Sequence, residues 1–115
     1  AAIRETNEEI GIEKSQMNII GCLTSFHIPV SKFEIFPYVG WTKSEPKTLI
    51  HDKEVDHVFS VTVNDLMLKK NCKLKKDMFS GHSVSIPYFD LGGEMVWGAT
   101  SMVLSEFKDI LKDVL

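Results

Sequence analysis

The sequence predicts an α/β sandwich, and three observations support this class. Apolar residues recur at helical spacing in the first thirteen residues and again from Ala99 to the end of the chain. Between these two stretches lie segments rich in β-branched and aromatic residues, which are typical of strands. Glycine and proline interrupt the segments and indicate turns. We therefore expect one helix, several strands and a final helix, without internal repeats or linkers.

The first predicted helix has an acidic edge and an apolar side. At about 100° per residue, Glu5, Glu8 and Glu9 fall within an arc of roughly 100°. The opposite side carries Ile3, Thr6 and Ile10. Gly11 is expected to end the helix, because glycine adopts the left-handed conformation of a helix C-terminus without steric cost.

Carboxylates three and four residues apart destabilise a helix slightly, so the acidic edge needs compensation. Arg4 faces Glu8 at the i+4 position and neutralises only part of the cluster. Hard divalent cations such as Mg²⁺ or Mn²⁺ prefer carboxylate oxygens. A solvated acidic face is the plain alternative, but the spacing, the glycine and the apolar opposite side favour a metal site formed by Glu5, Glu8 and Glu9.

The first half of the chain continues with strand-like segments. Residues 17–26 predict a strand in which Gly21 marks a bulge or a close approach. Residues 33–42 predict a second strand, which Pro37 interrupts. Polar residues 43–53 predict a loop. Alternating apolar positions in residues 55–63 predict a strand buried on one face for most of its length.

The second half is expected to contain a short helix, a hairpin and the last helix. Asn64 suits an N-cap for a helix over residues 65–70. Residues 84–90 and 94–97 predict paired strands that turn through Gly92 and Gly93. The last helix begins near Ala99, with Thr100 or Ser101 as its N-cap.

The lysine-rich segment KKNCKLKKD, residues 69–77, allows two interpretations. It holds five of the twelve lysines. We expect a solvated loop, and the alternative is a patch that attracts a polyanionic substrate by raising the local concentration of phosphates.

The first helix resembles the second half of the Nudix box, whose family pattern is Gly-x5-Glu-x7-Arg-Glu-U-x-Glu-Glu-x-Gly-U, with U an aliphatic residue. Six positions match: Arg4, Glu5, Glu8, Glu9, Gly11 and Ile12. Thr6 departs from the aliphatic preference. The opening glycine and first glutamate of the pattern would precede Ala1, so the resemblance implies a chain that is truncated at its N-terminus and begins inside the box.

The resemblance implies a Nudix fold, an α/β/α sandwich with a mixed β-sheet, over a single partial domain of residues 1–115. It also implies a pyrophosphohydrolase that uses Mg²⁺ or Mn²⁺. Glu8 and Glu9 would be metal ligands, Glu5 a ligand or a base, and Arg4 a partner that orients a glutamate. Some members take their base from a glutamate outside the box, and Glu54 is the candidate here. An ordinary charged residue is the equal alternative for Glu54.

Downstream segments resemble the coenzyme A diphosphatase branch of the family. They are residues 36–40 (FPYVG), residues 54–61 (EVDHVFSV) and residues 96–100 (VWGAT). The implied reaction cleaves coenzyme A or acyl-coenzyme A to 3′-phosphoadenosine 5′-phosphate and (acyl-)phosphopantetheine. Trp41 and Trp97 could stack on an adenine or line a pocket, and we expect core packing for Trp97.

Composition limits the partners. The formal net charge of −3 argues against a nucleic-acid or anionic-membrane binder and favours a small-molecule nucleotide substrate. Cys22 and Cys72 have neither disulfide-framework nor zinc spacing, so we expect free thiols in the cytoplasm. No apolar run approaches the roughly 20 residues that span a bilayer. A homodimer stays open.

Three other functions remain as alternatives. The first is a Nudix hydrolase of ADP-ribose, NADH or another nucleotide. The second is a ligand-sensing Nudix domain without catalysis, which the three intact glutamates argue against. The third is a polyanion-binding module built on the lysine-rich segment.

Overall fold

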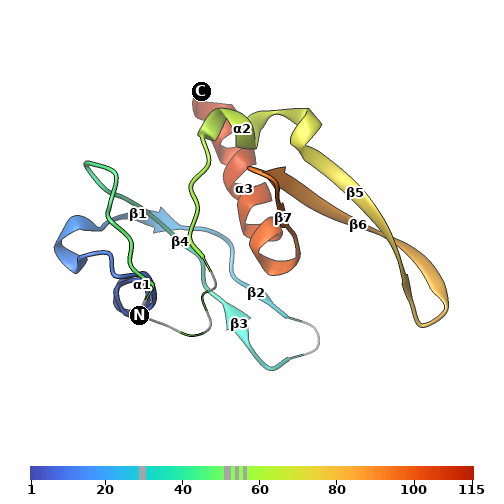
Figure 1. The fold of residues 1–115 in the computed structure, drawn as a ribbon, viewed down its shortest axis with the longest axis horizontal. Helices are drawn as coiled ribbons and strands as arrows, with labels where there is room; N and C mark the ends of the chain where they lie inside the picture. Colours follow the sequence, from blue (N-terminus) through green and yellow to red (C-terminus); the bar gives the residue numbers. More distant parts are fainter. Residues whose placement is uncertain (29–30, 51–52, 54, 56) are drawn as a thin grey trace. The chain divides into compact units, whose positions relative to one another are not determined.

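The computed structural model describes residues 1–28, 31–50, 53, 55 and 57–115. Backbone contacts divide the chain into two compact units, Ala1–Ser60 and Val61–Leu115 (Figure 1). The helices and strands follow the predicted order, with a helix first, strands between and a helix last.

Helix α1 (Ala2–Ile10) opens the first unit and ends as predicted. Gly11 lies at its C-cap with φ 75° and ψ 14°, in the left-handed region, and its N–H donates to the Asn7 carbonyl. The Asn7 side chain donates to the Ile12 carbonyl at 2.9 Å. These two hydrogen bonds satisfy carbonyl groups around the helix end and fix the direction in which the chain continues after α1.

Two short antiparallel ladders follow the 3-10 turn at Lys14–Gln16. Strand β1 (Asn18–Cys22) pairs with β4 (Tyr38–Trp41), and β2 (Phe26–His27) pairs with β3 (Glu34–Ile35). The register of β1 and β4 shifts between Ile19 and Gly21, so the predicted bulge is confirmed. Each of the predicted strands at 17–26 and 33–42 is divided into two shorter strands. The second division falls at Pro37, because proline cannot donate a hydrogen bond to a ladder.

The predicted strand at residues 55–63 is wrong. Described residues 55 and 57–62 form neither helix nor strand, and Val63 already belongs to α2 (Val63–Met67). Alternating apolar residues form a strand only where another strand accepts their backbone hydrogen bonds. Thr62 begins the helix instead, because its side chain accepts from the Asp65 N–H at 3.0 Å, and the expected cap at Asn64 is displaced by two residues.

Most of the lysine-rich segment, residues 72–77, lies in a strand, so the loop expected there is wrong. After a 3-10 turn at Lys69–Asn71, β5 (Cys72–Phe79) pairs over its whole length with β6 (His82–Leu91). The strand is solvent-exposed throughout, including its apolar residues Leu74, Met78 and Phe79. Its lysines are compatible with a strand because all of its residues are exposed.

Two tight turns order the three-stranded sheet β5-β6-β7 (Figure 1). Ser80 and Gly81 join β5 to β6, and Gly92 and Gly93 join β6 to β7 (Glu94–Val96). All four residues have positive φ, which matches the type I′ hairpin turn. The predicted hairpin is confirmed.

Helix α3 (Gly98–Val114) packs on this sheet and closes a small core. Leu66, Phe89 and Leu91 are buried, and Phe107 is among the α3 residues packed against them. The helix starts one residue earlier than predicted, with Trp97 at the N-cap and no side-chain capping bond. Ser101, an expected cap, instead donates to the Gly98 carbonyl at 2.7 Å.

The α/β class is confirmed, with helices and strands in both units. Each ladder among the described residues is antiparallel. The parallel pair that a mixed sheet also contains is not found in the part of the chain that the structure describes. None of the helices in the described ranges is long and apolar enough to cross a bilayer.

Candidate metal site on helix α1

Helix α1 carries four of the five predicted site residues, and three of them are exposed. The side chains of Arg4, Glu5 and Glu8 are 61%, 59% and 62% exposed. Glu9 is half-buried. Because α1 is a regular helix, Glu5 lies beside both Glu8 at i+3 and Glu9 at i+4, as the sequence predicted.

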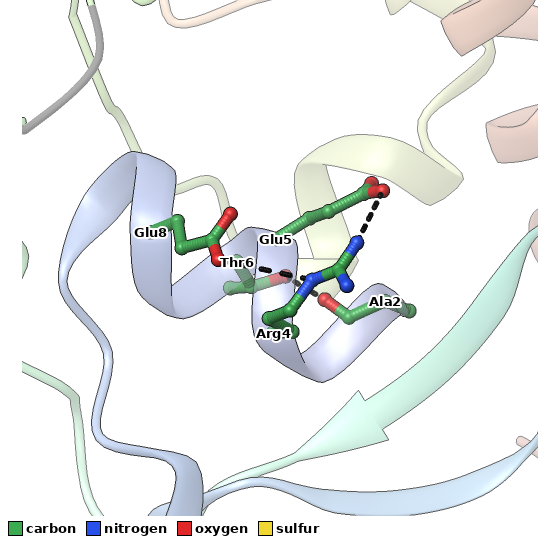
Figure 2. Close-up of polar contacts among 5 residues, drawn as sticks. All are labelled: Ala2, Arg4, Glu5, Thr6 and Glu8. Atoms are coloured by element: carbon green, nitrogen blue, oxygen red, sulfur yellow. Dashed lines mark hydrogen bonds and ion pairs between the residues drawn. The ribbon is translucent and has the colours of Figure 1, made fainter.

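Arg4 lies between two of these carboxylates (Figure 2). Its Nη2 is 3.9 Å from Glu5 Oε1, and its Nε is 3.7 Å from Glu8 Oε1. Both distances exceed that of a hydrogen bond, so the two contacts are ion pairs without a hydrogen bond. The predicted pairing of Arg4 with Glu8 is confirmed, and Glu5 joins it. One guanidinium thus partly compensates the like charges of the acidic edge.

Thr6 satisfies its hydroxyl inside the helix. Its Oγ1 donates to the Ala2 carbonyl at 2.8 Å (Figure 2). A hydroxyl that is bonded in this way can occupy a half-buried position at small cost. This contact explains how threonine stands where the family pattern prefers an aliphatic residue.

The donor set of α1 fits a hard divalent cation, because it offers carboxylate oxygens on adjacent turns. The side-chain directions fit less well. Among the described residues, no three acidic, histidine or cysteine side chains approach one another closely enough to hold a metal ion. Glu5 and Glu8 are both turned toward Arg4 (Figure 2). To bind a cation, Glu5 and Glu8 would have to rotate about their side-chain torsions, which their exposure allows.

The remaining predicted site residue, Glu54, lies outside the described residues. The structure therefore leaves its proposed role as a base a prediction.

Both cysteines and Trp97 are exposed. Cys22 and Cys72 are free, as predicted, and both are exposed. Trp97 is 56% exposed, so the expected core packing is wrong. Val96, the last residue of β7, packs against the core instead.

The apolar side of α1 borders a cavity of about 310 Å³ in the first unit. Ile3 and Thr6 line it from the helix, and Tyr38 and Trp41 line it from β4. Sequence reasoning named Trp41 as a possible pocket residue but missed Tyr38. Gly40 was the available signal: a Cβ there would meet the Asn18 carbonyl oxygen at 3.1 Å, which shows how closely β1 approaches β4 beside the cavity.

Comparison with known proteins identifies the family. A family profile described as NUDIX domain matches residues 1–81. This range includes all of α1 and extends from the first unit into the second.

Three curated proteins are similar to this chain. The mitochondrial coenzyme A diphosphatase NUDT8 of Homo sapiens is 30% identical over 108 residues, which cover 92% of this chain and 45% of that protein. Nudix hydrolase 3 of Caenorhabditis elegans is 30% identical over 77% of this chain and 38% of its own length. Nudix hydrolase 15, mitochondrial, of Arabidopsis thaliana is 27% identical over 90% of this chain and 38% of its own length. The chain thus spans less than half the length of these relatives.

Proposed function

Because the chain belongs to the Nudix family, we propose that it supplies the metal-binding helix of a pyrophosphohydrolase that acts on coenzyme A or acyl-coenzyme A. The products would be 3′-phosphoadenosine 5′-phosphate and (acyl-)phosphopantetheine. The observation that carries this proposal is the set of Glu5, Glu8 and Glu9 on one edge of α1, with Arg4 between Glu5 and Glu8. The substrate rests on the similarity to a protein named coenzyme A diphosphatase.

The chain's residues would divide the work as follows. Glu8 and Glu9 hold Mg²⁺ or Mn²⁺, and Glu5 is a further ligand or the base. Arg4 keeps Glu5 and Glu8 oriented, since its guanidinium lies within ion-pair distance of both. When bound, the cation supplies charge stabilisation at the phosphoryl oxygens and a more acidic water. Glu54 is the second candidate for the base.

We also propose that residues 1–115 are part of one Nudix domain. Support comes from the family profile, which continues across the boundary between Ser60 and Val61 without a break. The partner would be a small nucleotide. A homodimer is a further prediction, which the oligomeric state in solution would test.

The compartment is a separate proposal. Two exposed free thiols favour a reducing compartment, and we retain the cytoplasm as the prediction. Two of the relatives carry the word mitochondrial in their names. Fluorescence microscopy of a tagged full-length protein distinguishes the two locations.

A substrate panel tests the proposed activity. The full-length protein is incubated with Mg²⁺ or Mn²⁺ and, separately, with coenzyme A, ADP-ribose, NADH and dinucleoside polyphosphates, and the products are separated by chromatography. We expect turnover of coenzyme A with release of 3′-phosphoadenosine 5′-phosphate. Preference for ADP-ribose or NADH would contradict coenzyme A as the substrate and would still support hydrolysis of a pyrophosphate bond. Binding without turnover of any compound would favour a ligand-sensing domain.

A further inference from the structure

A cysteine and a buried lysine meet in the second unit, away from α1 in the sequence. Cys72 is the first residue of β5 and is exposed. Lys108 belongs to α3 and is only 7% exposed. The Lys108 Nζ donates to the Cys72 Sγ at 3.1 Å. The pair therefore connects the strand and the helix through a polar contact.

The surroundings of the Lys108 ammonium make this contact unusual. Its Nζ also lies over the Phe89 ring, 5.6 Å from the ring centre. The sulfur and this ring therefore both lie beside the ammonium. A buried cation is costly without a nearby negative charge. Negative charge that develops on the Cys72 sulfur during a nucleophilic attack would be stabilised by this ammonium, because hydrogen bonds to charged groups are the stronger ones.

A cavity of about 380 Å³ lies beside Cys72. Cys72 lines it, together with Lys73 and Tyr88 from the sheet and Ser101, Met102 and Ser105 from α3. Its walls are thus partly apolar and partly polar. The cavity gives room for a substituent on the sulfur.

We propose that the Cys72 sulfur, activated by the Lys108 ammonium that donates to it, exchanges with low-molecular-weight disulfides and that the resulting mixed disulfide occupies this cavity. The Cys72 sulfur attacks one sulfur of the incoming disulfide and forms a new S–S bond. The old S–S bond breaks, and its second sulfur leaves as a thiolate. One disulfide is consumed and one is formed, so no further oxidant is required. The proposal is independent of the metal site.

Cys22 provides a matched control in the same chain, because it is also exposed and free, and no contact with a lysine is found for it among the described residues. The full chain is incubated with glutathione disulfide at neutral pH, and mass spectrometry follows the peptides that contain each cysteine. We expect the Cys72 peptide to be modified about fivefold faster than the Cys22 peptide, or more. Equal or slower modification of Cys72 overturns the proposal.

Substitution of Lys108 separates charge from packing. Lys108→Met keeps a long apolar stem and removes the charge, and we expect it to slow Cys72 to the rate of Cys22. Lys108→Arg keeps the charge and should keep most of the advantage. An unchanged Cys72 rate in a folded K108M variant, verified by circular dichroism, also overturns the proposal. If K108M does not fold, the comparison of Cys72 with Cys22 in the unsubstituted chain decides alone.

Discussion

At the residue scale, Arg4 organises the acidic edge of α1. Its pairing with Glu8 could be predicted from the sequence because i+4 neighbours on a helix are fixed by local geometry. The additional pairing with Glu5 could not, since it depends on side-chain torsions that sequence does not determine. The same limit applies to metal binding: spacing predicts which carboxylates share an edge, whereas their convergence depends on rotamers and on the cation.

Substitution of Arg4 should impair catalysis while leaving the fold intact. Arg4→Gln removes the guanidinium that lies between Glu5 and Glu8, so these carboxylates lose a common orienting partner. We expect kcat/KM to fall by about 10- to 100-fold, as for other residues that orient metal ligands. Steady-state kinetics measure the change, and circular dichroism checks the fold. Undiminished kcat/KM in R4Q would show that Arg4 has no orienting role.

At the element scale, ends and turns were predicted better than pairing. The end of α1 at Gly11 and the turn at Gly92 and Gly93 follow from the backbone freedom of glycine, which is a local property. The fate of residues 55–63 depends instead on whether another strand lies beside them. The lysine-rich strand β5 illustrates the converse, because its partner β6 makes a strand of a sequence that reads as a loop.

Replacement of Gly11 tests how the end of α1 is held. Gly11→Ala places a Cβ on a residue with φ 75°, and we expect the free energy of unfolding to fall by about 1–2 kcal/mol. Gly21→Ala is the matched control, because a Cβ there meets no atom within 4 Å and φ is not in the left-handed region. Urea denaturation compares the two variants. Equal stabilities would mean that the left-handed cap contributes nothing.

The cross-strand pair of Lys73 and Asp90 gives the hairpin a pH dependence. Lys73 Nζ lies 2.6 Å from Asp90 Oδ2, and this hydrogen bond together with the charge of Asp90 raises the pKa of Lys73. A raised folded-state pKa contributes stability that is complete below the unfolded-state value and is lost as pH rises through the folded-state value.

We therefore expect Lys73→Met to lower the thermal midpoint slightly at neutral pH, and the difference from wild type to shrink above the ordinary lysine pKa of about 10.4. Thermal melts across alkaline pH measure it. A difference that stays constant over this range would exclude the pair as its source.

At the scale of the whole molecule, the sequence predicts the α/β class and the family, and the structure adds two compact units. Fold class follows from periodicity, and membership follows from a short motif confirmed by a profile over residues 1–81. Burial was harder to predict: Trp97 is exposed although tryptophan usually packs in cores. The contact of Lys108 with Cys72 joins residues far apart in the chain, so no local pattern announces it.

The most direct test of the proposed function is the activity of Glu9→Gln on the preferred substrate of the panel, with saturating Mg²⁺. Loss of a metal-ligating charge should lower kcat/KM by at least about 100-fold, while circular dichroism stays unchanged. Glu13→Gln is the control, because Glu13 is an exposed glutamate just beyond α1, and it should retain wild-type activity. If E9Q turned over substrate as fast as wild type, α1 would not be the metal site.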